Sequence, residues 1–195
     1  MMETTSTDGR LFNTSFVRSF KTGDNIALNV ESIALMHRIR AELPEHEAWK
    51  LNKSIVIAAA SIIEACLFEL VQRARFNTRE GIPNISQKHL DAIRKTKKDG
   101  LQFCVAIARE MKFLGPASGE IYNDLNDLVK LRDRIHIQNK WKHSPKCEKL
   151  AFNSESVLVA ERCLEKVLVC LSRKYPRNMC YTPPLHLPWN YGEDI

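Results

Sequence analysis

The segment from Ile55 to Val71 constrains the fold of this chain more than any other. Its sequence, IVIAAASIIEACLFELV, is apolar for almost its whole length and is interrupted by the charges of Glu64 and Glu69. A helix that is apolar on nearly all sides is typical of the centre of a bundle, where neighbours cover every face. A membrane span needs about 20 residues with few or no charges. The segment therefore predicts a buried core helix, and we expect no membrane association.

The composition allows such a core to be covered. The chain has 195 residues, of which 44% are hydrophobic and 27% are charged, as in an ordinary globular domain. It contains only 7 Gly and 8 Pro, too few for the frequent turns of a many-stranded β protein. No repeat and no alternation of strands with helices is visible. We expect an all-α protein.

Apolar spacing and capping residues predict the other helices. We expect helices at residues 24–43, 51–76, 118–139 and 154–174, and one bent helix or two between residues 86 and 114. Asp24 and Ser154 are the expected N-caps, and Pro44 is expected to close the first helix. Residues 140–153 are expected to form a basic loop. The predicted architecture is an antiparallel four-helix bundle with an additional N-terminal helix and an extended C-terminal tail.

This pattern divides the chain into an irregular segment, residues 1–22, a single helical domain, residues 23–174, and a tail rich in proline and aromatic residues, residues 175–195. The tail could pack on the bundle, act as an oligomer arm or stay loose. We favour packing, because Trp189 and Tyr191 would be costly to leave in water.

Several classes of site are excluded or disfavoured. The common nucleotide-binding, zinc-protease and serine-hydrolase motifs are absent, and we expect no cofactor. The six cysteines form no C-x-x-C pair, and His143 with Cys147 supplies only two potential metal ligands, so we expect no metal site. The N-terminus lacks the pattern of a secretory signal, which predicts a reducing, cytoplasmic location.

The positive charge is concentrated in one window. The whole chain has a formal net charge of +6, and residues 130–149 contain seven Lys and Arg against Asp133 and Glu148, a local balance of +5. A focused positive field suits a phosphate-bearing partner, although a charge run is often only a solvated surface.

Arg132 and His136 lie in this window, in the sequence LVKLRDRIHIQNK. Four residues apart, they would project from one face of the predicted helix. An imidazole can accept the proton of an RNA 2′-hydroxyl, and a guanidinium can stabilise the charge that grows on the phosphorane. Asp133 could orient a partner across an interface, and Asn139 could hold a sugar or phosphate oxygen.

The same residues also fit an architectural interpretation, in which Arg132 neutralises a buried carboxylate and His136 is an ordinary surface histidine. Glu64 is the relevant carboxylate, because an ionised group in the apolar core helix is costly unless it is paired. We expect Arg132 to be its partner. That pairing fits either interpretation.

The order of these elements resembles the HEPN superfamily of helical-bundle proteins over residues 51–174. The most specific likeness is Arg132, followed by the polar Asp133 and then by His136, which looks like the family's Arg-polar-x-x-x-His signature in a shortened form. Three residues separate the Arg and the His here, whereas the family usually has four to six. Many members are metal-independent endoribonucleases of toxin, antiphage or RNA-processing systems, and they act as dimers that join two such motifs in one cleft.

The resemblance implies that Arg132 and His136 are the catalytic pair, with Asp133 as the polar residue of the motif. It also implies a homodimer, an RNA substrate and a possible antitoxin or operon partner protein. The neighbouring residues that would contact RNA are Arg134, Lys140, Trp141, Lys142 and Lys146. Trp141 fits equally well as a core residue under the loop. The alternative, also known among HEPN proteins, is a non-catalytic module that binds RNA, a nucleotide or a protein partner.

Overall fold

The computed structural model describes residues 10–17, 20–76, 82, 86–95, 100–134, 147–177 and 184–189. Helices dominate this part of the chain, and its only strands form a two-stranded sheet, which confirms the all-α prediction. In chain order, the elements are β1 (Leu11–Phe12), α1 (Phe20–Glu42), α2 (Glu45–Ala48), the 3-10 helix η1 (Trp49–Leu51), α3 (Asn52–Phe76), α4 (Gln87–Lys95), α5 (Leu101–Glu110), α6 (Glu120–Asp133), α7 (Glu148–Ala151), α8 (Ser154–Lys174) and β2 (Leu185–His186).

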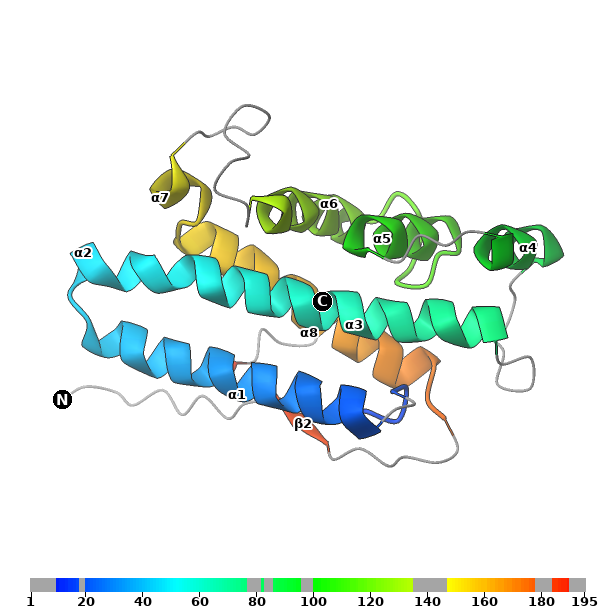
Figure 1. Cartoon of the computed structure of the whole chain (residues 1–195), viewed down its shortest axis with the longest axis horizontal. Coiled ribbons are helices and arrows are strands. Elements are labelled where there is room, and N and C mark those ends of the chain that lie inside the picture. Colours follow the sequence, from blue (N-terminus) through cyan, green and yellow to red (C-terminus); the bar gives the residue numbers. More distant parts are fainter. Residues whose placement is uncertain are drawn as a thin grey trace.

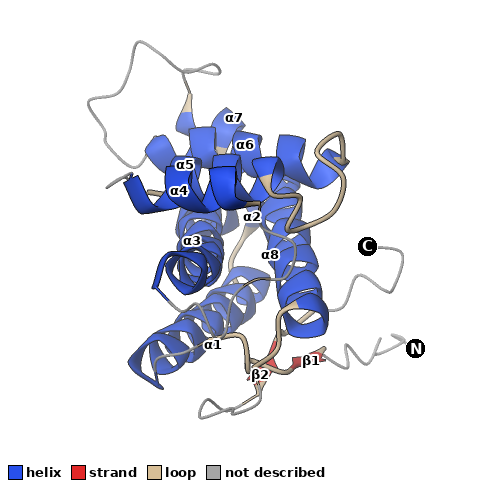
Figure 2. Ribbon diagram, turned by 90° about the vertical axis from the view of Figure 1, so that its right-hand side faces the viewer, coloured by secondary structure: helices blue, strands red, loops and turns tan. Residues whose placement is uncertain are grey.

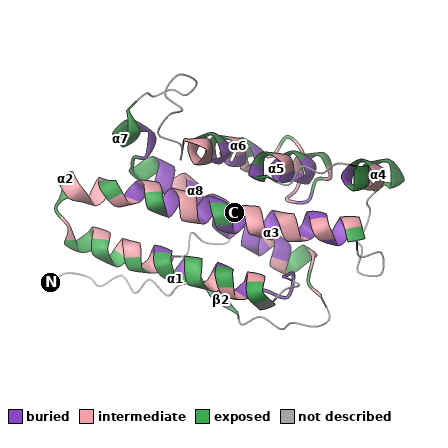
Figure 3. Cartoon of the chain, viewed as in Figure 1, coloured by how far each residue is buried: buried purple, intermediate pink, exposed green. Residues whose placement is uncertain are grey.

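Helix α3 lies at the centre of the molecule, as its composition predicts. It packs against α8, α5, α1 and α6, and Figures 1 and 2 show α3 and α8 between α1 on one side and α4, α5 and α6 on the other. By length and composition alone, the helical stretch Glu45–Phe76 could cross a membrane, but 56% of its most apolar window is buried inside the protein. Figure 3 shows this burial along α3 and α8, with exposed residues on the outer sides of α1 and α4.

The first helix begins earlier than predicted. It starts at Phe20, so that Asp24 lies inside α1 and is not its N-cap. The missed residues, FKTG, have no apolar residues at helical intervals, and the helix prediction relied on such intervals. The predicted end is correct, because α1 stops at Glu42 and the Pro44 carbonyl accepts hydrogen bonds from Glu47 and Ala48 at the start of α2.

The region between residues 86 and 114 contains two helices, which answers the question that the sequence left open. The Ser86 carbonyl accepts a hydrogen bond from the Leu90 N–H at 3.0 Å at the start of α4. Helix α5 begins after Gly100 and ends at a tight turn, where Gly115 has a φ of 126°. This left-handed backbone favours glycine, which has no Cβ.

Helix α8 closes the core, and its predicted apolar stripe is buried: Val157, Ala160, Leu164, Val167, Leu168 and Leu171. The predicted N-cap is wrong by one residue. The side chain of Asn153 accepts the Ser156 N–H at 2.9 Å, whereas the Ser154 hydroxyl receives a hydrogen bond from Arg40 at 3.2 Å. The preceding residues were expected to form a loop only, but Glu148–Ala151 form the short helix α7.

The two ends of the described chain pair with each other. Leu11 lies opposite His186 in the small antiparallel sheet, and the Leu187 N–H donates to the Arg10 carbonyl at 3.0 Å. The segment of residues 1–22 is therefore not wholly irregular, contrary to the sequence prediction. The prediction missed β1 because pairing between distant residues leaves no local signal in two short strands. Leu187 and Trp189 are buried, which confirms that this part of the tail packs on the bundle. Tyr191 lies outside the described residues.

We expect the Trp189→Ala substitution to lower the free energy of unfolding by about 3 kcal/mol, because it removes a large side chain that is only 8% exposed. Denaturant titration followed by circular dichroism measures this change. Leu11→Ala is the matched control from the paired strand: Leu11 is 65% exposed, and its loss should cost less than about 0.5 kcal/mol. Equal effects of the two substitutions would contradict the packing of the tail.

Candidate functional site

Arg132 lies in the last turn of α6 and contacts the central helix. Its Nη2 atom donates a hydrogen bond to Oε2 of Glu64 on α3 at 3.0 Å, which confirms the pairing that the sequence predicts. The side chain of Glu64 is 23% exposed and that of Arg132 is 39% exposed. The ion pair therefore fixes the guanidinium and leaves part of it accessible to solvent.

A second carboxylate lies next to the same guanidinium. Oδ1 of Asp133 is 3.8 Å from Nη1 of Arg132, so Glu64 and Asp133 both contact Arg132 from different helices. These are three of the residues that we predicted for the site, and the structure brings them together. Arg134, the fourth in the described part, is the C-cap of α6 and is half-buried.

The predicted extent of this helix is wrong. Helix α6 ends at Asp133, where the Arg134 N–H turns back to the Leu131 carbonyl at 3.1 Å and Arg134 leaves the helical backbone with a ψ of 1°. Residues 135–139, also predicted as helix, lie outside the described residues. The described residues thus do not place Arg132 and His136 on one helix face. The other predicted site residues lie outside the described part of the chain: His136, Asn139, Lys140, Trp141, Lys142 and Lys146.

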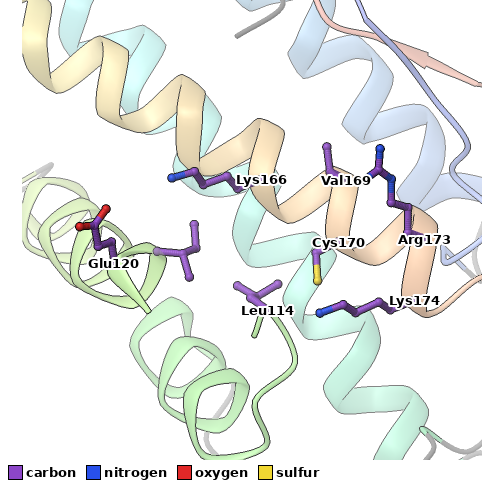
Figure 4. Close-up of a pocket in the computed structure, with 8 residues that line it drawn as sticks. Leu114, Glu120, Lys166, Val169, Cys170, Arg173 and Lys174 are labelled. Carbon is purple, nitrogen blue, oxygen red and sulfur yellow. The ribbon is translucent and has the colours of Figure 1, made fainter. Parts of the chain in front are cut away.

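A pocket of about 410 Å³ opens where the start of α6 diverges from the end of α8. Its apolar surface comes from Leu114, Ile121 and Val169. Its polar lining consists of Glu120 on α6 and of Lys166, Cys170, Arg173 and Lys174 on α8. Figure 4 shows Lys166, Cys170 and Lys174 on the side of α8 that faces Leu114 and Glu120.

Hydrogen bonds hold the wall of this pocket around Leu114. The Leu114 N–H donates to the hydroxyl of Tyr122 at 3.1 Å, and that hydroxyl donates to the Ala108 carbonyl at 2.9 Å. The neighbouring Phe113 carbonyl accepts from the Cys170 thiol at 3.1 Å and from the Tyr175 hydroxyl at 3.3 Å. The turn after α5 is therefore held in place by side chains from α6, α8 and the residue that follows α8.

Burial changes the acidity of these groups. It raises the pKa of Tyr175 to about 12, with smaller contributions from Cys170 and Tyr122. Burial also raises the pKa of Tyr122 and of the Cys170 thiol, although Lys174 opposes the shift at Cys170. The Cys170 thiol is thus protonated near neutral pH and is a poor nucleophile.

No sequence pattern by itself predicts this pocket. The available signal was the spacing of Lys166, Cys170 and Lys174, which recur every four residues and share one face of α8. Spacing alone cannot distinguish such a face from an ordinary solvated surface, because the pocket exists only where α6 diverges from α8.

Within the described ranges, no group of three or more His, Cys, Asp or Glu side chains is placed to hold a metal ion. The chain matches no protein-family model, no curated protein and no solved structure.

A double-mutant cycle on Glu64→Gln and Arg132→Met should give a coupling free energy of about 1 kcal/mol, because the pair is partly shielded from solvent. The matched control is the pair between Lys130 and Asp127 on the same helix, whose side chains are 68% and 64% exposed. There we expect about 0.3 kcal/mol. Denaturant unfolding measures both couplings, and a value for the first pair no larger than the control would contradict its role in the core.

Stability should fall as the pH rises from 10 to about 12, because an unfolded Tyr175 ionises near its ordinary pKa of 10.0 whereas the folded residue keeps its proton until about 12. Below pH 10 both states are protonated, and the contribution is complete. Thermal unfolding at a series of alkaline pH values tests this, and Tyr175→Phe should flatten the decline. If the melting temperature of Tyr175→Phe falls with pH as steeply as that of the parent, the loss of stability at alkaline pH comes from other groups.

Proposed function

We propose that this protein is a metal-independent endoribonuclease of the HEPN type, possessing a four-helix core within residues 51–174. The ion pair between Arg132 and Glu64 is the observation that carries the proposal, at an Nη2–Oε2 distance of 3.0 Å. It anchors a half-exposed guanidinium at the end of α6, within the most basic window of the sequence. A fixed cation next to a positive surface suits an RNA phosphate.

In the proposed reaction, the imidazole of His136 accepts the proton of a ribose 2′-hydroxyl. The 2′-oxygen attacks the adjacent phosphorus, and the 5′-oxygen of the next nucleotide leaves and takes a proton from water. The products are a 2′,3′-cyclic phosphate and a 5′-hydroxyl end. Arg132 stabilises the charge on the phosphorane, while Asp133 and Asn139 assist by positioning groups at the cleft.

The proposal includes a homodimer in the cytoplasm that brings two copies of the motif to one cleft. The cations after Arg132 would follow the RNA backbone: Arg134, Lys140, Lys142 and Lys146. Trp141 would stack on an unpaired base. The resemblance to HEPN proteins also suggests a toxin or antiphage role, with an antitoxin or operon partner protein.

We expect His136→Ala and Arg132→Ala each to reduce cleavage of structured RNAs at least about 100-fold, because each removes a group that stabilises the transition state. Gel analysis in the presence of EDTA, with identification of cyclic phosphate ends, measures this activity. Lys130→Ala is the matched control, since Lys130 is an exposed cation on the same helix end that pairs with Asp127. It should leave kcat unchanged. A His136→Ala protein that cleaves as fast as the parent would refute the ribonuclease proposal.

A non-catalytic binding module is the second candidate, and one observation favours it. Two carboxylates, Glu64 and Asp133, contact the Arg132 guanidinium and offset its charge. In this case the parent protein should cleave no RNA. The Arg132→Ala variant should have a lower melting temperature than the parent and nearly the same affinity for RNA. Loss of cleavage in Arg132→Ala with a nearly unchanged melting temperature would exclude this candidate.

A further inference from the structure

A second pocket, of about 380 Å³, lies at the opposite end of α8 from the pocket in Figure 4. We call it the α7–α8 pocket. It lies where the end of α1, the start of α3 and the short elements α2, η1 and α7 meet the start of α8. Its lining includes Arg40, Glu45, Trp49, Asn52, Lys149 and Ser154. It shares no residue with the Arg132–Glu64 pair or with the other pocket.

The charges of the α7–α8 pocket favour an anion. Arg40 and Lys149 contribute two positive charges against the single carboxylate of Glu45. Nη2 of Arg40 donates to the Ser154 hydroxyl at 3.2 Å, which fixes the guanidinium beside the first residue of α8. The cation is thus held in place before any ligand binds.

The dipole of α8 adds to this preference. Helix α8 has 21 residues, and its N-terminal residues Asn153 and Ser154 line the pocket, so the positive end of the helix lies there. The pocket in Figure 4 differs, because its cations Arg173 and Lys174 lie at the negative end of the same helix and already complement it. Of the two cationic pockets, the α7–α8 pocket is therefore the better site for a phosphate.

A buried amide points independently to a ligand. Asn52 lines the pocket and is 1% exposed. Its Nδ2 atom donates to the Phe152 carbonyl at 2.9 Å, whereas its Oδ1 atom has no hydrogen-bond partner. An unpaired buried acceptor is unfavourable, and a hydroxyl or amino group on a ligand would satisfy it.

The pocket also presents an aromatic surface. The indole N–H of Trp49 donates to the His46 carbonyl at 3.0 Å, which fixes the half-buried ring. Nζ of Lys149 lies 5.8 Å from the centre of that ring, and the exposed lysine side chain is free to shift toward a phosphate when a base covers the indole.

From this combination we infer that the α7–α8 pocket binds a nucleoside monophosphate unit. Arg40 and the start of α8 hold the phosphate, Trp49 stacks on the base, and Asn52 accepts a hydrogen bond from a hydroxyl or amino group. The unit is either a free mononucleotide or the phosphorylated end of an RNA strand, which share this chemistry. The inference does not depend on cleavage at Arg132, because the two sites have no residue in common.

Isothermal titration with AMP, inorganic phosphate and adenosine tests the inference on the full chain. We expect AMP to bind at least about tenfold more tightly than either fragment, because only AMP engages both the cations and the ring. Equal affinity for AMP and inorganic phosphate would overturn the inference. A 5′-phosphorylated octaribonucleotide and its 5′-hydroxyl form separate the two sources: preference for the phosphorylated strand over AMP assigns the site to RNA ends, and the reverse assigns it to free nucleotide.

Three variants locate the binding. Arg40→Gln and Lys149→Ala should each weaken AMP binding, Arg40→Gln by about tenfold and Lys149→Ala by less, since exposed Lys149 is the weaker contact. Because Lys149 is exposed, its variant reports on binding even if Arg40→Gln unfolds. Arg38→Ala is the matched control: Arg38 is an exposed cation on the same helix and does not line the pocket, so affinity should not change. Wild-type affinity in both Arg40→Gln and Lys149→Ala would overturn the assignment.

Arg132→Ala should bind AMP normally even if RNA cleavage fails, which separates this inference from the proposed ribonuclease.

Discussion

The need to bury the largely apolar helix α3 organises the rest of the structure, and only one stripe of α3 stays partly open to solvent, with Ser61 exposed and Glu64 and Phe68 half-buried. Burial of an apolar helix removes its surface from water and is the main favourable term in folding, but a helix with no polar face needs neighbours in several directions. Helix α8 covers one side, α5 and α6 another and α1 a third. Each of these helices can keep an outer polar face because α3 supplies the common centre.

Glu64 is one of two carboxylates in the apolar segment of α3, and it connects the core to the candidate site. A carboxylate at this depth is costly unless it is paired, and Arg132 at the end of α6 provides the partner at 3.0 Å. The pair sets the orientation of the guanidinium, whereas α6 is held on α3 and α8 by its buried residues Tyr122, Leu125, Leu128 and Val129. The same pair serves packing and also presents a cation at the surface, which is why the catalytic and architectural interpretations share their main residue.

Both pockets occur at the ends of α8, where neighbouring helices diverge and side chains no longer fill the space. Cations line both, yet the two ends of the helix are not equivalent. At the end of α8, Arg173 and Lys174 complement the negative pole of the dipole, whereas at its start Arg40 lies beside the positive pole. The helix dipole therefore distinguishes two sites whose lining residues look similar in composition.

The sequence by itself determined the all-α class, the central position of α3, the buried stripe of α8 and the pairing of Glu64 with Arg132. These follow from local periodicity and from the cost of an unpaired charge in an apolar helix, both of which can be read along the chain. Only the tertiary structure decided that α6 ends at Asp133, that Asn153 caps α8, that Leu11 pairs with His186, and that Arg40, Trp49 and Asn52 line one pocket. The strand pairing and the pocket depend on contacts between residues far apart in sequence, for which local patterns carry no information. The end of α6 and the cap of α8 rest on contacts between residues three apart, but the same sequence also allows a neighbouring boundary, and the folded backbone selects one.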